Sequence, residues 1–307
     1  YPRRIAMAGR LARFYQQSGL QSVARGSGVL RLLGLADRER LMPRASKEFF
    51  FSRLGRTFPA TGQRRARVAF FAGCLAQVTF TELNDATIRV LQANGCEVIV
   101  PAAQLCCGAL CVHAGVQDVA RDLARANFAA FLAEPFDAVV TNAAGCGSTL
   151  KEYEQLFATG TREHEQAKAF RAIARDVTEF LAELGIVAPM RPVPLRVTYQ
   201  DSCHLLHGQK IAKAPRELIR AVPGVELVEM PLADQCCGSA GVYNVTETRA
   251  SLELLSMKME NVRATGAQAI ITANPGCLLQ LRAGAEIHRT GQEVLHVVEL
   301  LDRAAPS

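Results

Sequence analysis

The feature that most constrains this chain is an internal repeat. Three short cysteine-bearing stretches recur in the same order in its two halves. The corresponding pairs are Cys74 and Cys203 at an offset of 129 residues, Cys106 and Cys236 at 130, and Cys146 and Cys277 at 131. Such constant spacing is the mark of a repeated supersecondary unit rather than of chance composition. The chain must therefore fold as two similar halves.

Each half has the pattern of an α/β unit. Short apolar or β-branched runs at 68–71, 97–100, 138–141, 197–199, 226–228 and 269–272 are expected strands. Helical stretches are expected at 80–94, 117–133, 148–158, 167–184, 209–221 and 247–265. Strands that alternate with helices predict a mostly parallel sheet with flanking helices. We expect a basic helical arm or linker at 1–66, a first unit at 67–187 and a second at 195–303, joined by a proline-rich linker.

Composition and charge narrow the functional classes. The chain lacks Trp and is 6% aromatic, so its core must be aliphatic. Residues 1–67 carry 15 Lys and Arg against 3 acids. This segment is either a solvated arm or a docking surface for an acidic partner or an anionic membrane. No nucleic-acid reader motif accompanies the charge. Walker, G-x-G-x-x-G and G-x-S-x-G motifs are also missing, which argues against a nucleotide or hydrolase site.

The cysteines are the candidate functional residues. Ten cysteines without a secretory signal indicate free thiols, which are best explained as metal ligands. Each unit supplies four: Cys74, Cys106, Cys107 and Cys146 in the first, and Cys203, Cys236, Cys237 and Cys277 in the second. Four thiolates suit an iron–sulfur cluster or a tetrahedral zinc. Zinc is the weaker alternative, because zinc modules usually use Cys-x-x-Cys knuckles. Cys96 and Cys111 fall outside the repeat.

The neighbours of these cysteines suggest how a site would form. Vicinal cysteines can serve one site only on an irregular loop, and Gly108 and Gly238 follow directly. Open α/β sheets place such loops at the carboxyl ends of their strands. Three histidines are candidates for a supporting or proton-handling role: His113, His204 and His207. Ordinary packing is the alternative for them, and Asp201 and Asp234 are weaker candidates. Thiol–disulfide catalysis ranks last, because vicinal disulfides are strained.

Six motifs in order carry a family resemblance. FFAGC, LCCGAL, TNAAGCG, YQDSCHLLHGQKI, QCCGSAGVYN and ANPGCLLQL together resemble the cysteine-rich CCG domains of heterodisulfide-reductase-related proteins. Within that group they are similar to the iron–sulfur subunits of glycolate oxidases (glycolate dehydrogenases), over about residues 65–302. The iron–sulfur subunits of lactate utilisation and of anaerobic glycerol-3-phosphate dehydrogenase are related alternatives.

The resemblance implies a function and a set of partners. It implies a [4Fe-4S]-type cluster, a subunit of an oxidoreductase complex, and FAD on a flavin-containing dehydrogenase partner that performs the substrate chemistry. Electrons would pass to a quinone-type acceptor. It also implies a cytoplasmic complex, with peripheral association at the inner face of the cytoplasmic membrane as an extension. A zinc-stabilised structural or docking module of the same kind of complex is the rival function, and zinc in one unit is the alternative cofactor.

Two departures from the family pattern stand out. Wider-family members end each unit with Cys-x-x-Cys, whereas Cys146 and Cys277 have no such partner, so the fifth ligand of a non-cubane cluster is missing. Full subunits also begin with a ferredoxin-like part, yet no cysteine precedes Cys74. That part is expected either upstream in a longer protein or on a separate chain.

Overall fold

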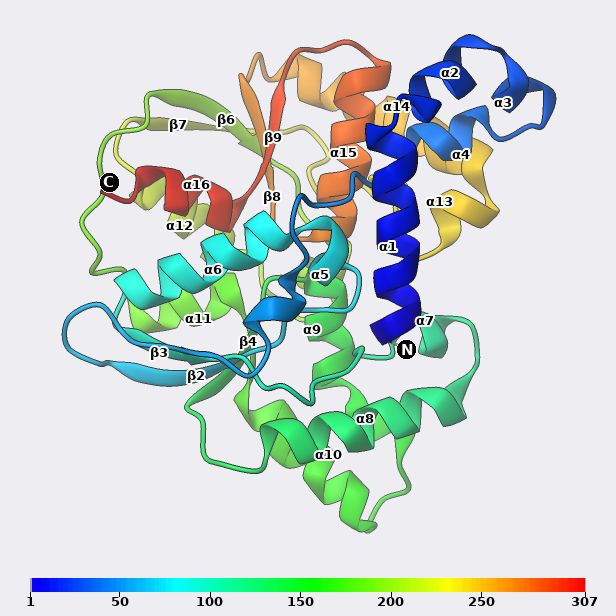
Figure 1. Cartoon of the computed structure of the whole chain (residues 1–307). Helices are drawn as coiled ribbons and strands as arrows, with labels where there is room; N and C mark the ends of the chain where they lie inside the picture. The colour runs from blue at the N-terminus through cyan, green and yellow to red at the C-terminus, as the bar shows by residue number, and fades with distance from the viewer. Residues whose placement is uncertain (1, 307) are drawn as a thin grey trace.

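The computed structural model describes residues 2–306 and contains two β-sheets (Figure 1). The first sheet has the order β1-β3-β2-β4-β5 and the second the order β7-β6-β8-β9. Their strands are β1 (Thr57–Phe58), β2 (Ala66–Phe70), β3 (Cys96–Ile99), β4 (Ala138–Thr141), β5 (Ala174–Asp176), β6 (Leu195–Tyr199), β7 (Val225–Glu229), β8 (Ala269–Thr272) and β9 (Glu293–His296). All pairings are parallel except the short β1–β3 edge. Without β1 the two sheets have one topology, which confirms the repeated α/β fold.

Four helices form a layer between the two sheets (Figure 1). They are α6 (Thr81–Ala93) and α11 (Val177–Leu184) of the first unit, and α12 (Ala214–Ala221) and α16 (Val297–Ala304) of the second. Helix α6 packs on α16, and α11 packs on α12. By the repeat α6 corresponds to α12 and α11 to α16, so these two contacts are equivalent. The units are therefore related by a pseudo-two-fold axis through this layer.

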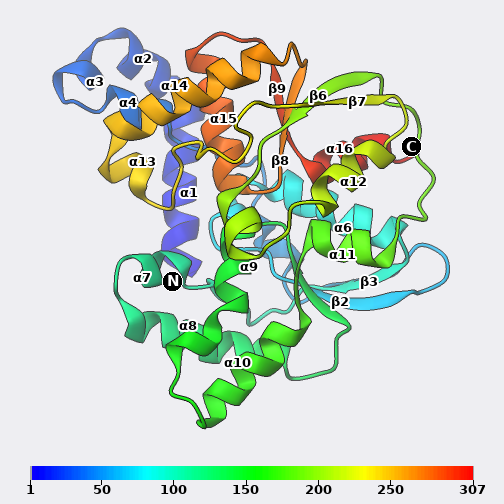
Figure 2. The same cartoon turned by 180° about the vertical axis from the view of Figure 1, so that it is seen from behind.

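The outer faces of the sheets are covered by further helices (Figure 2). Phe71, just after β2, and Val139 of β4 belong to a second core cluster built with the helices at 117–131 and 162–173, while Val68 and Phe70 face the middle layer. This alternation is the period-two pattern of a strand covered on both faces. The helices outside the middle layer are α5 (Ala76–Thr79), α7 (Ala109–His113), α8 (Gln117–Phe131), α9 (Ala144–Lys151), α10 (Arg162–Ile173), α13 (Tyr243–Thr246), α14 (Thr248–Ala264) and α15 (Pro275–Ile287).

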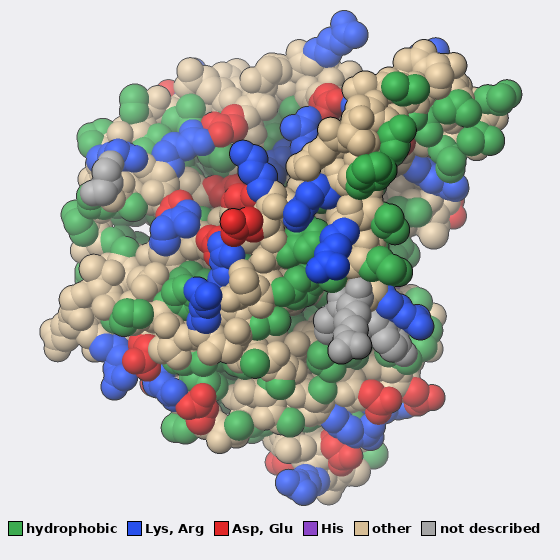
Figure 3. Space-filling view, viewed as in Figure 1, with side chains coloured by type: hydrophobic (Ala, Val, Ile, Leu, Met, Phe, Trp, Pro, Cys, Tyr) green, Lys and Arg blue, Asp and Glu red, His purple; other side chains and the backbone are tan. Residues whose placement is uncertain are grey.

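The N-terminal arm is helical up to Arg40, as expected, whereas the rest of it is mostly irregular and contains the short strand β1. It comprises α1 (Pro2–Gln17), α2 (Leu20–Gly26), α3 (Val29–Leu32) and α4 (Ala36–Arg40), followed by a 3₁₀ turn at Phe50–Arg53. Helix α1 packs on α5, and Arg25 of α2 forms ion pairs with Glu39 and with Glu286 of α15. Hydrophobic side chains gather over α2 and α3 (Figure 3), where Val23, Leu32 and Leu33 are exposed. The arm contacts both units and leaves much apolar surface uncovered.

Several expected helices have different bounds. The single helix expected at 167–184 is wrong: α10 ends at Ile173, β5 runs over Ala174–Asp176, and α11 follows. Asp176 accepts hydrogen bonds from the Thr178 backbone and hydroxyl, and this cap restarts the helix. The helix expected at 148–158 is α9 followed by a 3₁₀ turn at Tyr153–Leu156. The one expected at 209–221 begins at Ala214, where Pro215 occupies the first turn, after a π-helical turn at His204–Gly208.

The boundaries between units stay a prediction. One hydrophobic cluster contains Val68 and Leu91 of the first unit together with Val197 and Leu300 of the second. The two units therefore share a core rather than being separated by solvent. None of the helices within residues 2–306 combines the length and apolar character needed to span a bilayer.

Candidate functional site

The repeated cysteines all follow the carboxyl ends of three adjacent strands in each sheet. In the first unit Cys74 follows β2, the Cys106–Cys107 pair follows β3, and Cys146 lies in the first turn of α9 after β4. In the second unit Cys203 follows β6, the Cys236–Cys237 pair follows β7, and Cys277 lies in the first turn of α15 after β8. The predicted loops thus converge at the sheet edge where α/β proteins build their sites.

The four thiols of the first unit form a chain of contacts. Cys74 Sγ lies 3.2 Å from Cys106 Sγ, and Cys107 Sγ lies 3.3 Å from Cys146 Sγ. The vicinal Cys106 and Cys107 side chains interact and close the chain. All ten cysteines of the protein are free thiols.

The second unit repeats this arrangement. Cys203 contacts Cys236, Cys236 contacts Cys237, and Cys237 contacts Cys277. The order of contacts is the same as in the first unit, cysteine for cysteine. The sequence repeat therefore extends to the geometry of the two thiol sites, although the ligand role of the eight cysteines remains a prediction.

Protonation follows the same asymmetry in both sites. Hydrogen bonds from Cys107 and Cys74 lower the pKa of Cys106 to about 3. Hydrogen bonds from Cys203 and Cys237 lower the pKa of Cys236 to about 2. The donors respond oppositely: the pKa of Cys74 and of Cys203 is raised, first by donating to that thiolate and then by burial. One member of each vicinal pair is thus prepared as a thiolate, the form that binds metals.

Glycines shape the two vicinal loops. Gly108 and Gly238 have φ of 84° and 89°, a region that side chains other than glycine rarely adopt. Their backbone N–H groups donate to Cys106 Sγ at 3.4 Å and to Cys236 Sγ at 3.3 Å. A Cβ at Gly238 would lie 2.4 Å from the Ser251 carbonyl oxygen, whereas one at Gly108 would find its nearest neighbour at 3.4 Å. The second loop is therefore the more tightly enclosed.

The donors are not arranged around a single point. Within the described part of the chain, no three His, Cys, Asp or Glu side chains form a group that could hold one metal ion as they stand. The thiols touch one another instead.

The two thiol sites open onto one shared cavity. A space of about 180 Å³ lies between the units and is lined by cysteines of both: Cys74, Cys106, Cys107, Cys146, Cys203, Cys237 and Cys277. Apolar side chains such as Phe80, Leu110 and Leu279 complete the wall. Asn274 joins the sites across it, because its Oδ1 accepts from Gly145 N at 3.4 Å and its Nδ2 donates to Cys277 Sγ at 3.5 Å. Sequence reasoning missed Asn274.

A second, more polar cavity of about 450 Å³ adjoins the first. His113, His204, His207 and Glu152 line it, and it shares His113, Cys203 and His204 with the thiol cavity. The rings of His113 and His204 face each other with centroids 5.8 Å apart. Burial and then the neighbouring His113 lower the pKa of His204. The three predicted histidines are thus brought together beside Cys203, and their supporting role stays a prediction.

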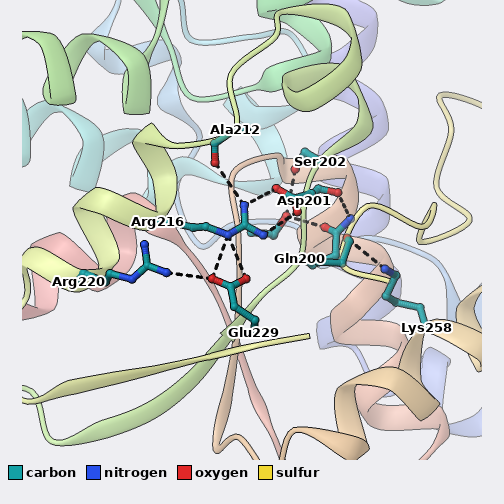
Figure 4. Close-up of polar contacts among 10 residues, drawn as sticks. Gln200, Asp201, Ser202, Ala212, Arg216, Arg220, Glu229 and Lys258 are labelled. Atoms are coloured by element: carbon teal, nitrogen blue, oxygen red, sulfur yellow. Dashed lines mark hydrogen bonds and ion pairs between the residues drawn. The ribbon is translucent and has the colours of Figure 1, made fainter. Parts of the chain in front are cut away.

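The remaining candidates take structural places. Cys96 is buried in β3, where burial raises its pKa to about 11, and Cys111 lies on α7 against the apolar cluster under α8. Asp201 is held by Arg216 through two hydrogen bonds of 2.8 Å, and Arg216 also binds Glu229 (Figure 4). Asp234 is exposed.

Buried polar residues that the sequence did not reveal support the vicinal loops. In the first unit Asn127 accepts from Leu105 N at 2.9 Å and donates to Cys106 O at 3.0 Å. Tyr153 donates to Cys107 O at 2.9 Å. In the second unit Lys258 donates to the carbonyl oxygens of Leu232 at 2.7 Å and Ala233 at 3.2 Å. The repeat could have pointed to Asn127 and Lys258 as equivalent positions, since they are 131 residues apart, like Cys146 and Cys277.

Two protein-family models match this chain, and the ranges that they match agree with the two units of the fold. Residues 68–151 and 197–282 each match the cysteine-rich domain family CCG, and residues 1–42 match the linker region of glycolate oxidase iron–sulfur subunits. Each CCG match covers three adjacent strands and the four repeated cysteines of one unit.

Individual relatives are similar to this chain over most of its length. The chain is 42% identical, over 98% of its length, to the probable glycolate oxidase iron–sulfur subunit of Bacillus subtilis, of which it spans 69%. It is 36% identical, over 78% of its length, to one of the subunits of the fumarate reductase (CoM/CoB) of Methanothermobacter marburgensis, and it spans 46% of that relative. It is also 34% identical, over 77% of its length, to lactate utilization protein A of a Geobacillus species, spanning 99% of that protein.

Proposed function

Because the chain belongs to the family of proteins with paired cysteine-rich CCG domains that includes glycolate oxidase iron–sulfur subunits, we propose that it is an iron–sulfur electron-transfer subunit. In this proposal each four-cysteine site holds one cluster of the [4Fe-4S] type. The complex is a flavin-dependent 2-hydroxy-acid dehydrogenase that acts on glycolate. The observation that carries the proposal is the pair of equivalent four-thiol sites facing one cavity.

The donor set fits a cluster on several counts. Each site supplies four thiols, which is the ligand number that [2Fe-2S] and [4Fe-4S] clusters take from cysteine. Gly108 and Gly238 direct N–H groups at sulfur, and such hydrogen bonds tune cluster potentials. Cys106 and Cys236 already have lowered pKa values. When bound, a cluster would supply one-electron storage and transfer. The apolar wall around the thiols would limit the access of water.

Substrate chemistry is proposed to lie on a partner. A flavin-containing subunit would oxidise the 2-hydroxy acid, a ferredoxin-like segment or chain would connect to the sites, and a quinone-type acceptor would take the electrons. The exposed apolar side chains over α2 and α3 provide surface for such contacts. We place the complex in the cytoplasm, with peripheral attachment to the inner face of the membrane as an extension supported by the arginines of residues 1–67.

Metal analysis tests the proposal directly. The chain is purified anaerobically, and iron, acid-labile sulfide and zinc are measured together with the visible and electron paramagnetic resonance (EPR) spectra. We expect iron and sulfide in near-equal amounts and two spectroscopically distinct centres. Zinc in the place of iron would instead support a zinc-stabilised docking module. The substrate is tested on the complex with its flavin partner: reduction of the chain by lactate or glycerol-3-phosphate, but not by glycolate, would assign it to one of those related dehydrogenases.

A further inference from the structure

Two residues at equivalent positions support the two vicinal cysteine loops in chemically different ways. Asn127 of α8 and Lys258 of α14 are related by the repeat, and the side chains of both are buried. Each holds the backbone beside or just before its Cys-Cys pair through two hydrogen bonds. Their structural task is therefore shared. Only their charge differs.

The charge of Lys258 is not cancelled by a bound carboxylate. Both hydrogen bonds recorded for its ammonium group go to backbone carbonyls, of Leu232 and Ala233. The buried Asp201 is paired with Arg216, and Glu229 is paired with Arg216 and Arg220 (Figure 4). That network of two acids and two arginines carries no net charge. Asp234 is exposed, where solvent screens it.

This cation acts on the second thiol site. Lys258 is buried on α14, and its ammonium group binds the carbonyl oxygens three and four residues before Cys236, those of Ala233 and Leu232. A buried charge interacts far more strongly than one in water, because little solvent screens it. The neutral amide of Asn127 has no such effect on the first site.

A fixed positive charge favours the reduced form of any centre beside it, because reduction adds a negative charge. Net charge and hydrogen bonding are among the terms that set cluster potentials. Resting on the proposed function, we propose that Lys258 gives the second centre the more positive reduction potential, so that electrons entering the chain collect there. The second centre is also the one whose Cys203 borders the histidine-lined cavity, from which a small acceptor would have access.

The test is an EPR-monitored redox titration of the anaerobic protein. A Cys277→Ser variant first identifies the midpoint potential that belongs to the second centre. We expect Lys258→Met to move that potential to a more negative value and to leave the other unchanged. A tenfold change in the equilibrium between the centres corresponds to about 59 mV for one electron. Lys258→Arg, which keeps the charge, is expected to keep the potential.

Asn127→Asp is the matched control in the other unit, and it is expected to lower only the first potential. The inference would be overturned if the second midpoint potential were the same in Lys258→Met as in the parent. It would also be overturned if Lys258→Arg shifted that potential as much as Lys258→Met does. If Lys258→Met loses its second centre, Lys258→Gln carries the test, since its amide can still donate to one of the carbonyls. Loss of the centre in both would make Lys258 a purely structural residue and also overturn the inference. Absence of iron from the parent would instead refute the proposed function.

Discussion

The two thiol sites agree in the arrangement of their cysteines and differ in the side chains that surround them. Both have the same order of sulfur contacts and the same glycine after the vicinal pair. Around the first site the loops are held by neutral amides: Gln104 accepts from Ala72 N at 2.9 Å and Asn84 donates to Ala72 O at 3.1 Å. Around the second, the charged side chains of Asp201, Arg216 and Lys258 hold the loops.

The contrast shows that the fold constrains the positions of the cysteines more strongly than it constrains the side chains that hold their loops. The cysteine positions follow from the strand ends, and a parallel sheet repeated with the same topology must bring the cysteines together in the same way. Supporting side chains only have to satisfy backbone hydrogen bonds, which an amide and an ammonium group do equally well. The supports are therefore free to diverge, and through them the electrostatics of the two sites.

Removing one vicinal cysteine should test whether the sites are independent. Cys107→Ser and Cys237→Ser are each expected to lose about half of the bound iron, because each deletes one of four thiolate ligands from one site only. Metal analysis and EPR spectra would show the loss of one signal in each variant. Loss of all iron from either single variant would show that the sites assemble as one unit and would end the comparison.

Replacing the glycine after each vicinal pair by alanine should lower the free energy of unfolding by different amounts in the two units. Gly238→Ala is expected to destabilise the fold by about 4 kcal/mol, since left-handed backbone strain adds to a collision with the Ser251 carbonyl. Gly108→Ala meets no contact under 3.4 Å and should cost only the strain, about 1–2 kcal/mol. Denaturant unfolding of the two variants side by side measures the difference. Equal losses would contradict the tighter enclosure of the second loop.

The helix caps of the two units should respond oppositely to pH. Burial raises the pKa of Asp176 to about 6, so its stabilising contribution is full below pH 3.8 and is lost as pH rises through 6. Burial lowers the pKa of His296 to about 4, so its contribution is present above pH 6.5 and is lost as pH falls through 4. His296→Asn, which keeps a capping oxygen, should therefore reduce the acid-induced loss of stability by up to about 3 kcal/mol.

Unfolding free energies of the parent and of His296→Asn at pH 7 and pH 4 would check this. Asp176→Asn is the matched control, and it should gain stability at pH 7 rather than at pH 4. A parallel change of both variants with pH would contradict the assignment.

The smallest expected effect concerns Tyr153, which has no counterpart beside the second site. The same 131-residue offset places Gly284 there, where a Cβ would collide with Leu255 and Met259. Tyr153→Phe removes the hydrogen bond to Cys107 O and one partner of Asn127, at a cost of about 1–2 kcal/mol. Thermal unfolding measures the cost, and an unchanged second EPR signal should accompany it. A disturbed second site would mean that Tyr153 acts beyond its own unit.

The sequence predicted the grouping of the repeated cysteines better than it predicted the buried side chains that hold their loops. The strands expected at 138–141 and 269–272 coincide with β4 and β8, because continuous apolar runs bounded by breakers are distinctive. Strand β5 was missed, since its three residues lie inside a run with helical character, and β9 escaped notice as another short strand. Lys258 and Asn127 sit in long helices, where a polar residue is ordinarily solvated. Only tertiary packing decided that these two are buried.

The pseudo-two-fold packing of α6 on α16 and of α11 on α12 bears on which substitutions the two halves can accept independently. Each half presents to the other the same surface that it receives, as two identical subunits of a homodimer would. A symmetric dimer is bound to keep its halves alike, because every substitution enters both at once. Joining the halves in one polypeptide removes that restriction, so one half can acquire a lysine where its twin keeps an asparagine.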